Sequence, residues 1–411
     1  MTTTDTAPDL GDWVAGYLSD PSTADPYPML ARLRAEDPVH HSRLGPWVFT
    51  RHHDVDAQPR DSRWSRAQAA AGEFGVPAEA DAELATAIRM NIAMLINRDA
   101  PDHRRLRALL QHAFTPRAIA SYQRTIDRVV TSVVDSVTDE EEFDFLRRVA
   151  YPIPEMVICD MMQVPHSDHD LWGEWAAKLV ARSRVDSDDE QNLEDGRYAI
   201  KSFYRYFKEL IAERRENRGD DLISVMINAE EEGDRLDEDE IIGACMLLIS
   251  AGHETTSNQI GNGMYLLFQH PEQRRLLEAD VSLVDSAVEE ILRFEPTTRF
   301  NLPRMATADI DVRGTVVPKG SLALFSYPAA NRDPEVFVDP ERFDITRTGN
   351  RHISFGSGVH FCLGVALARM ELRTAFHAIR ERFGDLELVS TPTWNNTYVR
   401  SLSELVVRRA R

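Results

Sequence analysis

The chain has 411 residues, 43% of them apolar, which is enough to bury a large core. Its formal net charge of −20 is spread along the chain, which argues against nucleic acid as a partner because a polyanion binds clustered Lys and Arg. The first residues lack the pattern of a signal peptide, no apolar run approaches the roughly 18 residues of a membrane span, and three cysteines are too few for a disulfide framework. These features predict a cytoplasmic globular protein with no nucleic-acid or membrane partner.

Apolar residues at three- and four-residue spacing predict the main helices, in chain order, at 119–137, 198–216, 238–269 and 363–383. The polar segment 183–195 is predicted to be a solvated connection between helices, too short for a domain linker. Strand-like segments are few and short, at 47–50, 310–312, 321–326 and 402–407. Residues 1–24 are expected to be loosely ordered. The pattern predicts one domain over residues 1–411, mainly α with small β-sheets.

The three cysteines lie in two kinds of surroundings. Cys159 and Cys245 lie in apolar stretches and are predicted to be small buried hydrophobic residues. Cys362 follows a glycine-rich loop and directly precedes a predicted helix, whose N-terminal amides favour the thiolate. Small residues in that loop would let the backbone approach a flat, bulky partner.

Two other functions for this loop, phosphate binding and nucleophilic catalysis, are disfavoured. A phosphate cradle is disfavoured because the glycine spacing fits neither GxGxxG nor GxxxxGK[ST]. A cysteine nucleophile paired with His360 is disfavoured because no orienting Asn or Asp is evident.

Residues 355–364, FGSGVHFCLG, resemble the haem-binding signature of the cytochrome P450 superfamily at every defining position. The resemblance implies the cytochrome P450 fold, with haem b held between a long central helix and the Cys-ligand loop. It makes Cys362 the axial ligand of the haem iron and places Phe355, Gly356 and Gly364 against the cofactor. A thiolate ligand donates more electron density to iron than a neutral histidine does.

Residues 251–256, AGHETT, resemble the oxygen-binding part of the family's central helix. A zinc HExxH site is excluded because position 257 is Ser. Gly252 within a helix costs about 1 kcal/mol relative to Ala, which predicts a local distortion. The Thr255 hydroxyl can bond to the carbonyl of Ala251, a residue that the resemblance places at the cofactor. Glu254 and Thr255 together form the catalytic proton relay that the resemblance implies.

Two further constellations match the family. Glu290 and Arg293 resemble its ExxR helix, and residues 340–343, PERF, suggest that Arg342 joins them in a buried structural cluster that holds the haem-side loop. Several basic residues match positions that contact the haem propionates in the family. Any one of them, taken alone, would be interpreted as a solvated surface residue. As a set in matching order they are expected to bind the two haem propionates, and they are His103, Arg107, Arg304 and His360.

The resemblance implies a monooxygenase that activates O2 with electrons from a separate ferredoxin and ferredoxin reductase. Its substrate would be a mainly apolar small molecule of secondary metabolism, such as a macrolide, terpenoid or aromatic compound, and the oxidation would be hydroxylation, epoxidation or coupling. The alternatives are a haem-binding sensor or carrier without turnover and a peroxide-driven enzyme. The Glu254–Thr255 pair disfavours both alternatives, because neither needs a proton relay.

The substrate pocket and the docking surface are also expected from the resemblance. The pocket would be mostly apolar with three asparagines (301, 395 and 396), and would draw on residues 90–96, 247–251, 300–302 and 394–398. If His103 and Arg107 face the haem, helix geometry directs Arg104 to the side and Arg105 away from the haem, and with Arg351 they would form part of the ferredoxin site. The competing interpretation is that these arginines are only solvated.

Overall fold

The computed structural model describes residues 9–20, 22–73, 81–182, 190–231, 234–384, 386–395 and 399–410. Helices dominate this part of the chain, and the strands form small sheets, which confirms the predicted fold class. The helices of the N-terminal half are α1 (Leu10–Ser19), α2 (Tyr27–Glu36), α3 (His52–Ala57), α4 (Arg66–Glu73), α5 (Ala82–Ala93), α6 (Asp102–Gln111), α7 (Pro116–Ser121), α8 (Gln123–Ser136), α9 (Pro152–Met161) and α10 (His169–Arg182). Those that follow are α11 (Glu190–Glu216), α12 (Leu222–Asn228), α13 (Glu238–Gln269), α14 (Pro271–Ala279), α15 (Val284–Phe294), α16 (Tyr327–Ala330) and α17 (Val365–Arg382).

The strands pair mainly across long stretches of sequence. The largest sheet has the order β1-β2-β10-β7-β3 and comprises β1 (Val39–His41), β2 (Trp47–Phe49), β10 (Leu322–Phe325), β7 (Arg304–Ala306) and β3 (Trp64–Ser65). A second sheet joins β11 (Leu386–Leu388), β12 (Val406–Arg409) and β4 (Glu142–Asp144). Two hairpins complete the set, β5 (Glu230–Glu231) with β6 (Asp234–Arg235) and β8 (Ile310–Val312) with β9 (Thr315–Val317).

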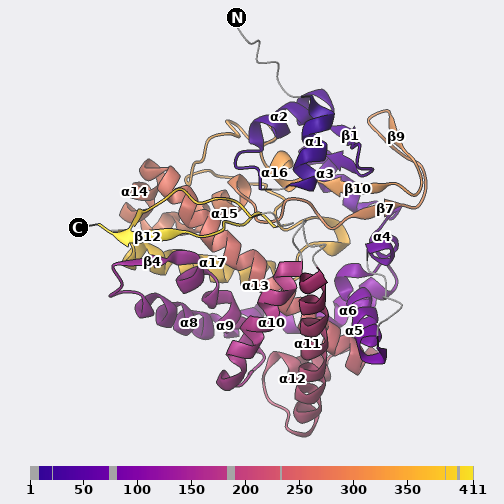
Figure 1. Cartoon of the computed structure of the whole chain (residues 1–411), viewed down its shortest axis with the longest axis vertical. Helices are drawn as coiled ribbons and strands as arrows, with labels where there is room; N and C mark the ends of the chain where they lie inside the picture. The colour runs from indigo at the N-terminus through magenta and orange to yellow at the C-terminus, as the bar shows by residue number, and fades with distance from the viewer. Residues whose placement is uncertain are drawn as a thin grey trace, which may run out of the picture.

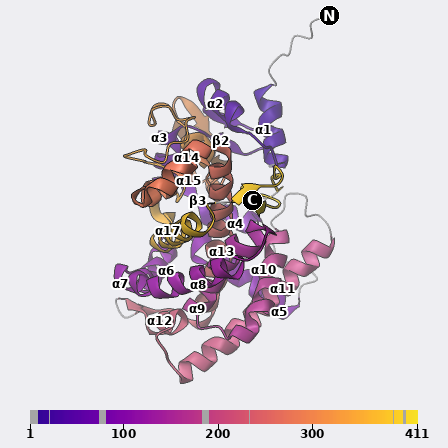
Figure 2. The same cartoon turned by 90° about the vertical axis from the view of Figure 1, so that its left-hand side faces the viewer.

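Most of the long helices lie apart from the largest sheet (Figure 1). Helices α1–α3 gather with β1, β10 and α16 at the top of Figure 1, and α5, α6 and α8–α12 lie below them. Both views place α13 among the other long helices, and Figure 2 shows it behind α8 and α17. The main apolar core surrounds α13 and includes buried side chains of α8, α9, α11, α15 and α17. No helix in the described ranges is long and apolar enough to cross a membrane.

The central helix α13 has the bounds that the periodicity predicts, 238–269. It begins at a capping box, in which the Asp237 side chain accepts from the Glu240 amide and the Glu240 side chain accepts from the Asp237 amide. The other predicted helices are found with changed ends. The segment predicted as one helix at 119–137 is divided at Tyr122 into α7 and α8, and the polar segment 183–195 includes the start of α11, with residues 183–189 outside the described residues.

The predicted loose order of residues 1–24 is wrong for most of the described part of that segment. Asp9 caps α1, and Val14 and Tyr17 on that helix are 1% and 3% exposed. The guanidinium of Arg299 lies 4.0 Å from the centre of the Tyr17 ring and donates to its hydroxyl oxygen. Burial of these side chains against the body of the protein orders the segment.

Candidate active site

The loop before α17 is closed by its own backbone. The carbonyl of Phe355 accepts a hydrogen bond from the Cys362 amide at 3.0 Å. Gly356 and Gly358 have φ values of +76° and +70°, a region that favours glycine, and a Cβ on Gly358 would lie 2.8 Å from the Pro59 carbonyl oxygen. Gly364 has an ordinary φ of −85° and open space where a Cβ would project. The loop therefore presents Cys362 at the start of α17 with little bulk around it.

The surroundings of Cys362 differ from those predicted. Burial raises the pKa of its thiol, and the Gly364 amide and the charges of Arg107 and Arg369 oppose this effect without outweighing it. The amide contribution expected from the sequence is present, but the polypeptide alone does not favour the thiolate. A bound metal ion deprotonates a coordinating thiol outright. Cys159 and Cys245 are fully buried, which raises the pKa of both thiols, and they are hydrophobic core residues as predicted.

Basic side chains gather beside this loop without acceptors. The rings of His103 on α6 and His360 in the loop lie 4.2 Å apart. Within the described part of the chain, the Nε2 atoms of both and the Nε atom of Arg304 are buried without a hydrogen-bond partner. Burial, and then neighbouring positive charge, lowers the pKa of His103 to about 4 and that of His360 to about 2. Buried donors of this kind require acceptors, so the cluster fits the two carboxylates of haem.

Two more arginines accompany this cluster. Arg107 is half-buried, and burial lowers its pKa, an effect that the interaction with Cys362 opposes without outweighing it. Arg66 is a residue that the sequence analysis missed. It donates to the Asn97 side chain at 2.8 Å and to the Pro303 carbonyl at 3.1 Å, and its charge acts on His360. No motif or spacing in the sequence links Arg66 to the Cys362 loop, so only the fold could reveal it.

The polar turn of α13 contains three bonds from side chains to backbone carbonyls one turn earlier. The Thr255 hydroxyl donates to the Ala251 carbonyl at 2.7 Å, as predicted. Ser257 and Asn258 donate in the same way to the carbonyls of residues 253 and 254, both at 2.8 Å. The helix nevertheless remains continuous, so the distortion predicted at Gly252 is not found. Gly252 instead permits close packing, because a Cβ there would lie 3.0 Å from Cδ1 of Ile158 on α9.

One face of this turn is not covered by protein. Ser250 and Ala251 are exposed, although Ile249 and Thr256 on the same helix are buried. Because α13 runs through the apolar core, exposure at these positions indicates room for a bound group. Glu254 lies beside this face, and burial raises the pKa of its carboxyl to about 7. The residue can therefore gain or lose a proton near neutral pH.

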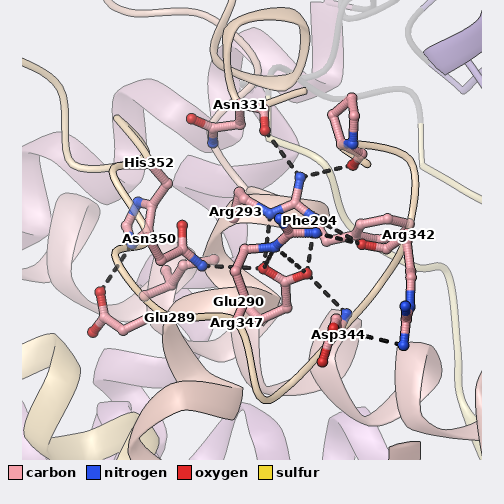
Figure 3. A network of polar contacts seen from close by, with 12 residues as sticks. Glu289, Glu290, Arg293, Phe294, Asn331, Arg342, Asp344, Arg347, Asn350 and His352 are labelled. Carbon is pink, nitrogen blue, oxygen red and sulfur yellow. Dashed lines mark hydrogen bonds and ion pairs between the residues drawn. The ribbon is translucent and has the colours of Figure 1, made fainter. Parts of the chain in front are cut away.

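A buried polar network fixes the segment that leads to the Cys362 loop (Figure 3). The carboxylate of Glu290 accepts two hydrogen bonds from Arg293, at 2.7 and 2.8 Å, and both side chains are fully buried. Glu290 also accepts from the Asn350 side chain at 3.1 Å, and Arg293 donates to the Asn331 carbonyl at 3.0 Å. The predicted Glu290–Arg293 pair is present, and it ties α15 to the loop segments that precede Cys362.

The predicted place of Arg342 in this cluster is wrong. Only its backbone carbonyl takes part, accepting from Arg293 at 3.0 Å. Its guanidinium is 65% exposed and lies 3.7 Å from Asp344, because the turn in which the Arg342 amide bonds to the Asp339 carbonyl directs the side chain outward. The second guanidinium that contacts Glu290, beside that of Arg293, belongs to Arg347, at 3.2 Å. The sequence contains this second arginine five residues after Arg342, and its presence there is the feature that could have indicated the correct partner of Glu290.

Other predicted contacts are also corrected. Arg105 is not a free surface cation, because it pairs with Asp234 and Glu240 at the start of α13. Asn395 donates to the Leu402 carbonyl at 2.9 Å, beside the isolated bridge between Trp394 and Leu402, so its amide group is engaged within the chain. Residues 396–398 of the predicted pocket lie outside the described residues.

Comparison with known proteins places this site in a family. The cytochrome P450 family model matches residues 184–398. Cytochrome P450 CYP107DY1 of Priestia megaterium is 40% identical over 77% of this chain and 77% of its own length. Cytochrome P450 monooxygenase PikC of Streptomyces venezuelae is 36% identical over 96% of this chain and 93% of its own. The crystal structure of P450BioI in complex with hexadec-9Z-enoic acid ligated acyl carrier protein has a TM-score of 0.86 at 34% identity, covering 95% of this chain and 100% of that chain.

These relatives confirm three expectations: the fold, the haem b cofactor and the monooxygenase class. The match extends over most of the chain and includes relatives from bacteria. The buried donors beside Cys362 and the uncovered face of α13 agree with it. The chain belongs to the cytochrome P450 family.

Proposed function

We propose that this protein is a haem-thiolate monooxygenase that oxidises a mainly apolar small molecule of secondary metabolism, with Cys362 as the axial ligand. The observation that carries the proposal is the group of buried donors without acceptors, at His103, His360 and Arg304, next to the Cys362 loop. When bound, haem would supply the activation of O2, with two electrons and two protons, that inserts one oxygen atom into the substrate.

The residues of this chain would have separate tasks. Cys362 would provide the thiolate, and the propionates would be bound by His103, Arg107, Arg304 and His360. Phe355, Gly356, Gly364 and Ala251 would border the macrocycle. The buried Glu290–Arg293 pair, with Arg347 in place of Arg342, would hold the loop and take no part in the chemistry.

Glu254 and Thr255 would deliver protons. A carboxyl whose pKa is about 7 can be recharged from water near neutral pH, and the Thr255 hydroxyl can donate onward while it bonds to the Ala251 carbonyl. Thr255→Ala should keep substrate binding but lower the fraction of electrons recovered in product by about tenfold, the remainder appearing as hydrogen peroxide. Thr255→Ser, which keeps the hydroxyl, should retain most of the coupling, and equal coupling in both variants would contradict the relay.

The finer parts of the proposal are the electron donor and the substrate. We infer a separate ferredoxin and ferredoxin reductase, and a substrate such as a macrolide, terpenoid or aromatic compound. One relative is named polyketide biosynthesis cytochrome P450 PksS, and one similar structure is a complex with hexadec-9Z-enoic acid ligated acyl carrier protein. These names support testing both free and carrier-linked substrates. Cytoplasmic location and a single domain over 1–411 stay predictions.

The decisive experiment is reconstitution of the purified haem protein. Candidate natural products, free and linked to an acyl carrier protein, would be ranked by the spectral shift that they cause in the ferric protein. The best binders would then be incubated with O2 and a ferredoxin system, or with hydrogen peroxide alone, and products identified by mass spectrometry. Product formed only with the ferredoxin system supports the proposal. Product with peroxide alone, or binding without any product, would replace it with the peroxide-driven or the sensor alternative.

A further inference from the structure

Glu289 precedes the buried Glu290 and binds a different set of groups. Its carboxylate accepts two hydrogen bonds from Arg369 on α17, from Nε and Nη2, both at 2.7 Å. It accepts a third from His352 Nε2 at 3.0 Å, and the His352 side chain is 1% exposed. Figure 3 shows Glu289 and His352 beside the Glu290 network. One carboxylate thus joins α15, α17 and the segment that leads to Cys362.

Both groups held by Glu289 lie against Phe355. The guanidinium carbon of Arg369 is 4.8 Å from the centre of the Phe355 ring, and the His352 ring centre is 5.9 Å from it. The Phe355 carbonyl accepts the Cys362 amide and so closes the loop. The positive charge of Arg369 also acts on the Cys362 sulfur, where it favours the thiolate. Glu289 therefore influences Cys362 in two ways, through the groups that it holds against Phe355 and through the charge of Arg369.

The charge state of this group is fixed. Burial acts to raise the pKa of Glu289, but hydrogen bonds from His352 and Arg369 and the charge of Arg369 lower it to about 2. The carboxylate is therefore ionised at any working pH and offsets most of the Arg369 charge. A bidentate pair of this kind also fixes the plane of the guanidinium over Phe355.

We propose that Glu289 is a positioning residue that sets the ferric–ferrous equilibrium of the haem, by holding Arg369 and His352 against Phe355 and by offsetting the Arg369 charge that acts on the Cys362 sulfur. The proposal rests on the proposed function, since it requires Cys362 to be the axial ligand. Neither the ExxR resemblance nor the Cys motif assigns this task to Glu289. Removing the carboxylate charge leaves the Arg369 cation unopposed in its action on the sulfur, which favours the reduced form, whereas removing the Arg369 charge has the opposite effect.

The test compares reduction potentials of holoprotein variants by spectroelectrochemistry. In Glu289→Gln the ferrous-to-ferric ratio at a fixed applied potential should rise about fivefold, the scale of one unit charge acting through a partly polar interior. In Arg369→Gln it should fall by a similar factor, and the double variant should return near the wild-type value. Glu289→Asp, which keeps the charge, should also stay near it.

Asp285→Asn is the matched control, because Asp285 pairs with Arg373 at 3.0 Å one turn away on the same two helices. Asp285 is 69% exposed, so the same change of charge there should be screened and leave the equilibrium unchanged. Thermal unfolding of each variant would be measured in parallel. Shifts of the same sign in Glu289→Gln and Arg369→Gln, or lowered unfolding temperatures without any shift, would show a merely structural role and overturn the proposal.

The measurements also separate failure of this inference from failure of the proposed function. If Glu289→Gln does not retain haem, an unchanged equilibrium in Arg369→Gln alone would overturn the inference. If the wild-type protein lacks the red-shifted carbon monoxide spectrum of thiolate ligation, the assignment of Cys362 is wrong. If the wild type has that spectrum but Glu289→Gln behaves like Asp285→Asn, only the inference about Glu289 fails.

Discussion

At the scale of single residues, Cys362 is set apart by what surrounds its sulfur. Cys159 and Cys245 are enclosed by apolar side chains. Burial raises the pKa of each thiol, and no neighbouring charge or hydrogen bond outweighs this effect. At Cys362 the same effect of burial is opposed by a backbone amide and by two arginines. Such a site accepts a negative sulfur once a metal ion is bound.

The ligand assignment is checked by substitution of each cysteine. Cys362→His should give a haem protein without the red-shifted carbon monoxide spectrum of thiolate ligation. Cys159→Ala and Cys245→Ala should keep that spectrum and lose about 1 kcal/mol of stability, because each removes a small buried side chain. A thiolate-type spectrum in Cys362→His would assign the ligand to another residue.

Glu371 on α17 is a second buried acid, outside the proposed relay. Burial raises the pKa of its carboxyl to about 8, and Oε2 has no hydrogen-bond partner among the described residues. Between the ordinary pKa of Glu and about 8, the folded state holds a proton that the unfolded state has released. The stability that this group confers is therefore greatest at low pH and falls as the pH rises through that range.

The substitution Glu371→Gln should remove this dependence of stability on pH. At about pH 5 the variant and the wild type should unfold alike, and at about pH 8.5 the variant should be more stable by roughly 2–4 kcal/mol. Urea unfolding at the two pH values measures the difference. Glu381→Gln, at an exposed position on the same helix, is the control and should show no such trend. A difference that is the same at both pH values would mean that Glu371 does not titrate in this range.

At the scale of elements, glycines set how closely α13 approaches its neighbours. A Cβ on Gly263 would lie 2.5 Å from Cζ of Phe376 on α17 and 2.9 Å from Cγ2 of Ile291 on α15. Gly243, on the same helix, has no neighbour closer than 3.7 Å. The two glycines therefore differ in their effect on the fold. Gly263 allows α13, α15 and α17 to pack closely, whereas Gly243 has no such packing role and only lowers the helix propensity of α13.

Alanine at these two positions should have opposite effects. Gly263→Ala should destabilise the protein by about 2 kcal/mol, because both neighbours are buried and must shift. Gly243→Ala should stabilise it by up to about 1 kcal/mol through helix propensity. Thermal unfolding of the ferric protein measures both. Equal effects at the two sites would show that the packing around Gly263 can relax without strain.

At the scale of the whole molecule, the net charge of −20 bears on the electron donor. An acidic ferredoxin would be repelled at long range, but at about 0.15 M salt the Debye length is roughly 8 Å, so a local basic patch decides docking. Arg104 on α6 is exposed and available for such a patch, whereas Arg105 is engaged with Asp234 and Glu240. The ferredoxin hypothesis therefore narrows to Arg104 and to Arg351, which is also exposed.

Charge reversal tests this docking surface. Arg104→Glu should lower the rate of first-electron transfer from a ferredoxin about tenfold at low salt and reduce its dependence on salt, since rim charges act on association. Substrate binding should be unchanged. Lys319→Glu, which makes the same change of charge at an exposed turn after β9, is the control. A wild-type rate for Arg104→Glu at low salt would place the ferredoxin site elsewhere.

Sequence by itself determined the features that depend on neighbours along the chain. The Cys362 loop, the Thr255–Ala251 bond and the bounds of α13 follow from residues at fixed short spacing, because a turn or a helix brings such residues together in any context. The Glu290–Arg293 pair follows in the same way from its spacing of three residues.

Only the tertiary structure decided which distant groups meet. Arg347 rather than Arg342 reaches Glu290, Arg66 joins the histidines near Cys362, and the Tyr17 ring packs beneath Arg299. Such contacts arise where separate elements cross, as when β4 pairs with β12 or Glu289 meets Arg369. A long, flexible arginine can serve many partners, and the backbone around it, not its place in the sequence, selects the one that it binds.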